Sequence, residues 1–306
     1  MDRLQERGGS EDFGHIPVML NEVIEYLNPV PGNIFIDGTL GLGGHAEVML
    51  DIIGAKGRLI GIDRDAQALA LAQENLKRYR GQCVFAHRNY RHIDQILAEL
   101  SIQHVDRILL DLGLSSFQLN NPERGFSFRV EGPLDMRMDQ DSYISAFDLV
   151  NSLSEKEISS ILKDFGQERW HHRIARNIVQ GRSRKPIETT KELSDMVLRA
   201  MPRHSKRAKI HPATRTFQAF RIAVNRELEG LEEALDKCID ALTVGGRIGV
   251  ISFHSLEDRI VKLKFRSLAK KGTLNLIVKK PLRPSDGEAK INSRARSARF
   301  RIAERT

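Results

Sequence analysis

The stretch that decides the fold of this chain is Asn33-Ile34-Phe35-Ile36-Asp37-Gly38-Thr39-Leu40-Gly41-Leu42-Gly43-Gly44-His45. In it an apolar run ends on an acid, four glycines fall within seven residues, and a segment with helical character follows. That order predicts a strand, a tight turn and a helix, with glycines where a ligand must approach the backbone closely. A second acid, Asp63, ends the next apolar run, at the place where ribose hydroxyls would be bound. The sequence therefore predicts a cofactor that contains a nucleoside.

Two cofactors compete for this loop. The stretch Gly41-Leu42-Gly43-Gly44-His45-Ala46 satisfies the dinucleotide pattern G-x-G-x-x-A, which predicts a nicotinamide cofactor. The turn starts earlier than that pattern, however, because Asp37 and Gly38 precede its first glycine. A strand ending in an acid and followed by D-G-T-x-G-x-G-G resembles the first motif of S-adenosylmethionine (SAM) methyltransferases. We favour SAM from this loop, and keep a nicotinamide cofactor and a glycine-rich turn without a ligand as alternatives.

The composition is that of a globular protein with its own core. The chain has 306 residues, of which 41% are hydrophobic and 29% are charged. Its apolar runs stop short of the roughly 18 residues that a membrane span needs, and the N-terminus lacks the apolar core of a secretory signal. Cys83 and Cys238 lie far apart, which argues against a disulfide framework and a cysteine zinc site. We expect a cytoplasmic protein without membrane contact and a reaction that needs no metal.

The net charge of +8 is unevenly distributed along the chain. Residues 169–215 hold 13 Lys/Arg against three acids, and residues 259–306 hold 15 against three, so the rest of the chain is acidic. A basic run is often only a solvated surface, but two such blocks favour a polyanionic partner, because clustered cations release counterions from nucleic acid. The residues expected to hold RNA phosphates are Arg199, Arg203, Lys206, Arg207 and Lys209.

Short apolar strands alternate with helical segments in the first third of the chain. Strands are expected at 33–37, 58–63, 82–87 and 105–111, and helices near 44–53, 65–80 and 91–100. No convincing strand occurs from about 120 to 212, where helical patterns such as 155–165 and 169–180 dominate. Alternation resumes with a helix at 213–242, a strand at 246–252, a helix from Ser255, and strands at 273–280 and 298–303.

This pattern predicts an α/β fold with a doubly wound, mostly parallel sheet and an inserted helical domain. We assign residues 1–118 and 213–306 to the two parts of a Rossmann-like domain, and residues 119–212 to an insertion that recognises the substrate.

Two further strand ends carry candidate chemistry. Asp111 closes the fourth strand, where an acid accepts a hydrogen bond from a target amine, holds the cofactor, or only caps the strand. An exocyclic base amine is a poor nucleophile, so acceptors that help its nitrogen become tetrahedral would assist transfer. His254 follows the fifth strand and is a candidate proton acceptor or base contact, although a lone histidine is more often structural. Ser255 with Asp258 forms a capping-box variant that would start the next helix.

Several blocks in a fixed order resemble the RsmH (MraW) family of SAM-dependent methyltransferases, which act on N4 of a cytidine in the decoding region of 16S ribosomal RNA. The resemblance runs from about residue 15 to residue 306. Beyond the glycine loop its carriers are Leu110-Asp111-Leu112-Gly113-Leu114-Ser115-Ser116, Glu123-Arg124-Gly125-Phe126-Ser127-Phe128, Gly132-Pro133-Leu134-Asp135-Met136-Arg137-Met138, His211-Pro212-Ala213-Thr214-Arg215-Thr216-Phe217-Gln218-Ala219 and Ser252-Phe253-His254-Ser255-Leu256-Glu257-Asp258-Arg259.

The resemblance implies a site as well as an activity. It implies SAM contacts at Gly43, Gly44, His45, Asp63, Tyr90, Asp111 and Gln118, with Tyr90 beside the adenine. It also implies the small ribosomal subunit as partner and, at the level of the family, a homodimer. Departures from the family pattern include Phe117, where proline is usual and which precedes Gln118. A nicotinamide-dependent oxidoreductase and a non-catalytic protein that binds RNA or ribosomes are the alternative functions.

Overall fold

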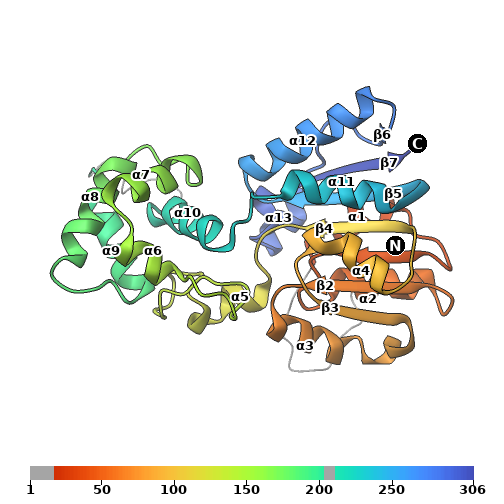
Figure 1. Cartoon of the computed structure of the whole chain (residues 1–306), viewed down its shortest axis with the longest axis horizontal. Coiled ribbons are helices and arrows are strands. Elements are labelled where there is room, and N and C mark those ends of the chain that lie inside the picture. Colours follow the sequence, from red (N-terminus) through yellow and green to blue (C-terminus); the bar gives the residue numbers. More distant parts are fainter. Residues whose placement is uncertain (1–16, 203–210) are drawn as a thin grey trace.

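The computed structural model describes residues 17–202 and 211–306, and it divides them into a sheet-containing lobe and a helical lobe (Figure 1). The helical lobe lies beyond one end of the strands, so these strand ends face it across the connecting segments (Figure 1). Within the described ranges, no helix combines the length and the apolar character that crossing a bilayer requires.

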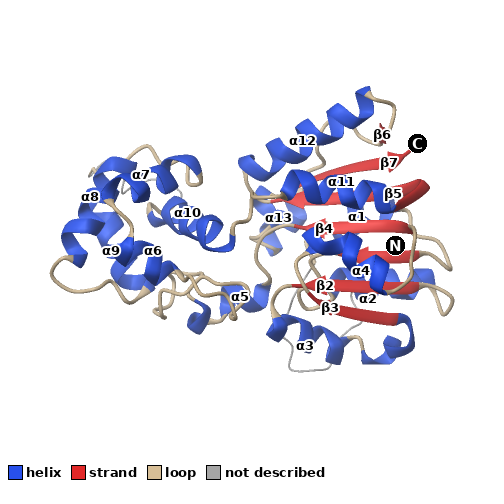
Figure 2. Ribbon diagram, in the orientation of Figure 1, coloured by secondary structure: helices blue, strands red, loops and turns tan. Residues whose placement is uncertain are grey.

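The sheet has seven strands in the order β3-β2-β1-β4-β5-β7-β6 (Figure 2). The first five run parallel to one another, and β7 runs antiparallel to both of its neighbours. This confirms the predicted α/β fold with a doubly wound, mostly parallel sheet. The strands are β1 (Ile34–Asp37), β2 (Arg58–Asp63), β3 (Cys83–His87), β4 (Val105–Asp111), β5 (Leu242–Ser252), β6 (Leu274–Leu276) and β7 (Arg299–Arg305).

The central strands are apolar on both faces because helices cover both sides of the sheet. Ile36 lies opposite Ile60 and Ile108 and belongs to one buried core, while its neighbour Phe35 belongs to the other. The first core is closed by α4 (Ile93–Glu99), α11 (Leu231–Ala241) and α12 (Ser255–Lys270), and the second by α1 (Leu20–Leu27), α2 (Gly44–Ile53) and α3 (Ala66–Asn75).

The helical lobe has a third core of its own, built from residues between Phe126 and Phe220. Three of its helices start with a capping box, formed by Ser145 with Asp148, Ser154 with Glu157, and Thr189 with Glu192. The lobe's helices are α6 (Ala146–Ser152), α7 (Glu155–Asp164), α8 (His171–Arg182), α9 (Thr190–Ala200) and α10 (Ala213–Asn225). Because Phe217 and Phe220 of α10 are buried in this core, we propose that the insertion extends to about residue 225 rather than 212.

The sequence-based helix at 213–242 is wrong, because two separate helices occupy that range. Arg226 (φ 50°) and Gly230 (φ 65°) adopt left-handed backbone conformations, which end α10 and start α11. Two other elements are shorter than expected, since the strand at 273–280 is only the three residues of β6, and α3 gives way to a 3₁₀ helix. The remaining short helices are α5 (Ser116–Asn120), α13 (Asp286–Ile291) and the 3₁₀ segments Lys77–Gln82, Tyr90–His92, Pro122–Arg124 and Ala295–Ser297.

Candidate functional site

An open cavity lies at the carboxyl ends of the parallel strands. This is where an open α/β sheet binds its ligands. The structure brings six of the seven predicted cofactor residues together in its wall: Gly44, His45, Asp63, Tyr90, Asp111 and Gln118. Gly43 lies one residue outside that lining, as the N-cap of α2.

The glycines of the first loop serve different purposes. A Cβ on Gly38 would lie 2.4 Å from Leu110 Cδ2 and 3.3 Å from Tyr90 Cβ, so a larger residue here would have to displace the Leu110 side chain. Gly43 has φ 84°, a conformation that L side chains rarely adopt, and it starts α2 without a side-chain cap. The unmet N–H groups of the first helical turn are suited to an anionic group of a ligand.

Asp63 ties the end of β2 to the glycine loop. Its Oδ2 accepts a hydrogen bond from the Gly41 N–H at 2.7 Å, and its Oδ1 accepts one from the Asp65 N–H at 2.9 Å. Burial raises the pKa of Asp63 above its ordinary value. The carboxylate therefore shapes the loop and still borders the cavity, as a ribose-binding acid must.

Asp37 and Asp111 end the two neighbouring strands β1 and β4, and they are joined through Thr39. The Thr39 N–H donates to Asp37 Oδ1 at 3.1 Å, and Thr39 Oγ1 accepts the Asp111 N–H at 2.6 Å. Burial raises the pKa of Asp37 to about 8 and that of Asp111 to about 7. Arg294 opposes the shift of Asp111, and its guanidinium donates to Leu114 O and Ser116 Oγ at the rim.

Asp111 Oδ1 is buried and accepts no hydrogen bond from any described residue. A buried acceptor without a donor is costly, so the site is built for a donor that the protein does not supply. This oxygen can accept a hydrogen bond from a ligand, either the cofactor or the target amine expected from the sequence.

Tyr90 and His45 occupy different parts of the cavity wall. Tyr90 opens the 3₁₀ segment after β3, and burial raises the pKa of its hydroxyl to about 12, so it stays neutral. The His45 ring lies with Nε2 2.9 Å from the Val18 carbonyl oxygen, which links α2 to the segment that precedes α1. His45 therefore borders the cavity while its ring serves the packing of the lobe.

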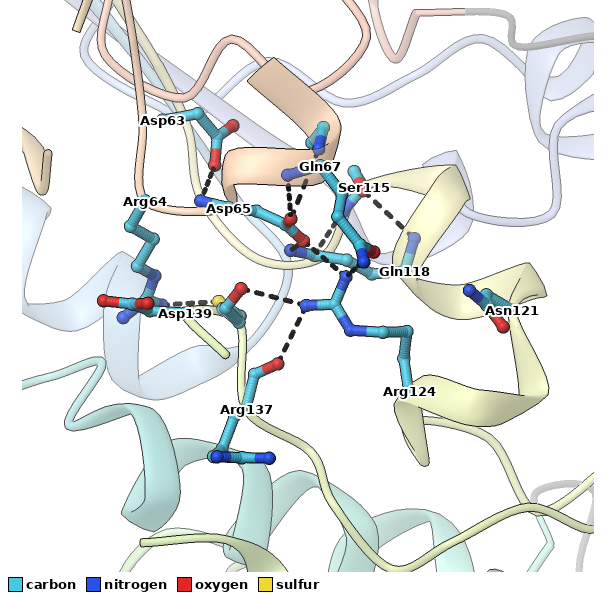
Figure 3. Close-up of polar contacts among 12 residues, drawn as sticks. Asp63, Arg64, Asp65, Gln67, Ser115, Gln118, Asn121, Arg124, Arg137 and Asp139 are labelled. Carbon is cyan, nitrogen blue, oxygen red and sulfur yellow. Dashed lines mark hydrogen bonds and ion pairs between the residues drawn. The ribbon is translucent and has the colours of Figure 1, made fainter. Parts of the chain in front are cut away.

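Gln118 belongs to a buried polar cluster rather than facing the cavity with a free amide. Its Nε2 donates to Asp65 Oδ2 at 2.7 Å, and its Oε1 accepts the Ser115 N–H at 3.1 Å in a capping box that starts α5. Arg124 Nη1 lies 2.8 Å from the same Asp65 oxygen, and both side chains are at most 2% exposed (Figure 3). Arg124 also donates to the carbonyl oxygens of Arg137 and Met138, both at 2.9 Å (Figure 3).

Asp65 is also the N-cap of α3, since its Oδ1 accepts the N–H groups of Gln67 and Ala68. One carboxylate thus joins the helix after β2, the α5 turn and the polypeptide that enters the helical lobe. Phe117, which stands where proline is usual, does not disturb this arrangement, because the capping box of Ser115 and Gln118 is formed.

His254 does not line the cavity, whereas Glu257, one turn later in α12, does. The predicted cap is displaced by one residue, because the capping box is made by His254 and Glu257 instead of Ser255 and Asp258. His254 Nδ1 accepts the Glu257 N–H at 3.4 Å, and its Nε2 lies 3.2 Å from Glu257 Oε1. The His254 ring therefore lies against Glu257, and because it does not line the cavity it is poorly placed to act as a base.

Glu227, in the turn between α10 and α11, also borders the cavity. Arg221 pairs with it through two hydrogen bonds of 2.9 and 2.8 Å. Burial raises the pKa of Glu257, but His254 and Arg221 outweigh this and hold it below its ordinary value, so Glu257 is ionised at neutral pH. Among the described residues, Glu227, His254 and Glu257 form the one group close enough to hold a metal ion, but the guanidinium of Arg221 already occupies the Glu227 carboxylate.

The predicted RNA-binding residues are only partly covered by the structure. Arg199 is exposed on α9, whereas Arg203, Lys206, Arg207 and Lys209 lie outside the described residues. The second basic block is partly neutralised by folding, because Asp258 pairs with Arg299 and Arg301 at 2.7 Å and Lys264 pairs with Asp236 at 2.7 Å.

Several charged residues of the cavity wall were not predicted from the sequence, among them Glu227, Glu257 and Arg294. Glu257 lies in the stretch 252–259, where the pattern of Ser255 and Asp258 predicted a helix cap and gave Glu257 no role. Glu227 was hidden by the single helix expected across 213–242.

Comparison with known proteins agrees with this geometry. The family model of the MraW methylase family matches residues 12–306. A protein named ribosomal RNA small subunit methyltransferase H from Geobacter sp. (strain M21) is 47% identical over 310 residues, covering 96% of this chain and 99% of that protein. Proteins of the same name are 49% identical in Trichlorobacter lovleyi and 45% identical in Clostridium botulinum (strain Kyoto / Type A2), with the same two coverages.

Proposed function

Since the chain belongs to the MraW methylase family, we propose that it transfers the methyl group of SAM to N4 of a cytidine in the decoding region of 16S rRNA. Family membership confirms the resemblance drawn from the sequence blocks and makes the chain a SAM-dependent methyltransferase. The relatives named for the small-subunit rRNA support the class of substrate, and the base and atom are our own proposal.

The observation that carries the proposal is the arrangement of acids along the cavity. Asp63 stands at the ribose end, while Asp111 and Glu257 stand at the end beyond β4, where a substrate base would enter. We assign cofactor binding to Gly43, Gly44, His45, Asp63, Tyr90 and Asp111, and a positioning role to Gln118 through Asp65.

SAM supplies a sulfonium whose methyl group is already activated for transfer. The protein has to orient the weakly nucleophilic amine and hold the charge that develops on it. In the transfer the C–S bond breaks, a C–N bond forms, and the cationic amine then loses a proton. Asp111 Oδ1 and the Glu257 carboxylate are the acceptors offered to the amine N–H groups, and the proton passes to one of them or to water.

His254 acts on this chemistry through Glu257. Its ring and the N–H of Phe253, which donates to Glu257 Oε2 at 3.0 Å, fix the carboxylate at the cavity wall. We therefore propose His254 as a positioning residue and Asp111 as a catalytic one.

Basic residues of the helical lobe are proposed to hold the rRNA backbone: Arg199, Arg203, Lys206, Arg207 and Lys209. Changing Lys206 and Arg207 to Glu should weaken RNA binding and leave SAM affinity unchanged, and unchanged RNA binding would contradict this assignment. A cytoplasmic location and a homodimer complete the proposal, and light scattering after size exclusion would test the second.

One assay tests the reaction. Labelled SAM is incubated with small ribosomal subunits from cells that lack the activity, and the rRNA is digested to nucleosides. Label in N4-methylcytidine supports the proposal, and label in another nucleoside contradicts the choice of target. Absence of label together with RNA binding would indicate a non-catalytic ribosome-binding protein, and NADH binding would indicate an oxidoreductase.

A further inference from the structure

A second groove adjoins the cofactor cavity, with which it shares Arg64, Arg88, Asn89 and Arg91. It runs from the ends of β2 and β3 to Arg226, in the turn that follows α10, and so touches both lobes. Its described lining contains four arginines and two histidines, and the single acid in that lining is Asp139.

Two of the arginines that the groove shares with the cavity, Arg64 and Arg91, donate hydrogen bonds to backbone carbonyl oxygens. Arg64 Nη1 donates to the Asn225 carbonyl oxygen at 3.0 Å, and Arg91 Nη2 donates to the Arg226 carbonyl oxygen. Neither forms an ion pair with another residue in the described ranges, and Arg91 Nε is buried without a hydrogen-bond partner. Burial lowers the pKa of Arg91, and the positive charges of Arg64 and Arg226 add to that shift.

The other two arginines are exposed and held loosely. Arg88 lies 2.9 Å from Glu99 and Arg226 lies 2.6 Å from Glu229, in ion pairs whose members are all at least 42% exposed. Exposed pairs of this kind contribute little to stability, so either arginine can exchange its partner for another anion.

We propose that this arginine groove binds backbone phosphates of the single-stranded RNA that adjoins the target nucleotide. Arg226 of the groove is followed in the chain by Glu227, whose carboxylate lies within 4.8 Å of that of Glu257, at the end of the cavity where the base would enter. RNA next to that base can therefore reach the groove. Single-stranded nucleic acid is held by cationic grooves that follow the backbone, and a groove with four arginines and one acid in its described lining is complementary to it. The inference rests on the proposed function and adds a second RNA contact, separate from the predicted cluster at 199–209.

Two variants test the groove without touching the cofactor cavity. Arg226→Glu reverses a charge that lines the groove alone, and Gln95→Glu adds an acid at another exposed groove position. The matched controls are Lys77→Glu, an exposed cation that also pairs with a glutamate three residues away, and Gln73→Glu, an exposed glutamine on α3.

The readout is the dissociation constant for 16S rRNA over a series of salt concentrations, with SAM affinity measured in parallel. The Arg226→Glu/Gln95→Glu double variant should weaken RNA binding on the order of tenfold at low salt and reduce the log–log salt slope by about 0.7 per lost phosphate. Its SAM affinity should equal that of the wild type. RNA binding that matches the Lys77→Glu/Gln73→Glu control would overturn the inference, whereas a wild type that binds RNA but methylates none would overturn the proposed function alone.

Discussion

Replacing Arg124 by methionine should destabilise the protein far more than removing any surface charge. Methionine keeps most of the buried stem of Arg124 and removes its guanidinium, which lies 2.8 Å from Asp65 with both side chains at most 2% exposed. The Asp65 carboxylate would keep Gln118 and two backbone N–H groups as partners but lose its counter-charge. The carbonyl oxygens of Arg137 and Met138 would each lose a donor.

Breaking a buried ion pair from one side costs about 3–5 kcal/mol, because a charge stays buried without compensation. A loss of that size is a large share of the roughly 5–15 kcal/mol by which a folded domain is stable. We therefore expect the free energy of unfolding to fall by that amount, seen as a lower urea midpoint at an unchanged m-value in unfolding curves followed by circular dichroism.

The control is Arg78→Met, whose partner Asp51 lies 3.3 Å away with both side chains about half exposed. Its loss should stay below about 1 kcal/mol. In the double variant Asp65→Asn/Arg124→Met the buried charge is gone while asparagine still caps α3, so its loss should be smaller than the sum of the single losses. A loss for Arg124→Met that equals the Arg78→Met value would refute the view that this pair joins the two lobes.

Five further results are expected. Asp111→Asn should lower the methyl-transfer rate by more than tenfold with SAM affinity less affected, and an equal loss of both would assign Asp111 to the cofactor alone. The pKa values of Asp37 and Asp111, raised from 3.8 to about 8 and about 7, mean that the folded apo protein binds protons more tightly than the unfolded chain. Its unfolding free energy should therefore fall as pH rises from about 4 to about 8, and a flat profile would contradict those shifts. Binding of cationic SAM at pH 7 should release protons, seen as a buffer-dependent heat in calorimetry. Glu257→Gln should reduce turnover while keeping α12 capped and SAM bound, since the amide oxygen still accepts the Phe253 N–H, and full activity would remove Glu257 from the reaction. Asp63→Ala should weaken SAM binding, and calorimetry that finds unchanged affinity would remove Asp63 from the site.

The sequence predicted the parts of the site that depend on local order along the chain. Asp63 and Asp111 each end a parallel strand, and the carboxyl ends of parallel strands lie on the same side of the sheet, so the two acids could be placed together before any coordinates were known. The pairing of Asp65 with Arg124 could not be predicted, because residues far apart in sequence meet only when the helical lobe has docked. The position of Glu227 depends on a left-handed residue at 226, which is an arginine and carries no sequence signal for a turn.

The charge blocks show a second limit of sequence-based inference. The charge counts indicated a polyanionic partner, but they could not show which cations form ion pairs within the protein. Such internal pairs are formed by Arg299, Arg301 and Lys264. The groove around Arg64 and Arg91 lies outside both blocks, since its arginines come from strand ends and a turn that are scattered along the sequence.

The pairing of β4 with β5 has a consequence for how the chain is made. β4 ends at Asp111 and its parallel partner begins at Leu242, so the whole helical lobe leaves the ribosome before the sheet can be completed. Until then the nascent chain presents β4, with its buried apolar residues, as an unpaired edge that invites association with other chains. The helical lobe, with a core of its own, can fold during this interval and hold the two halves of the sheet domain near each other. Synthesis that pauses after about residue 225 should therefore favour correct folding, and removal of the lobe should leave a protein that aggregates.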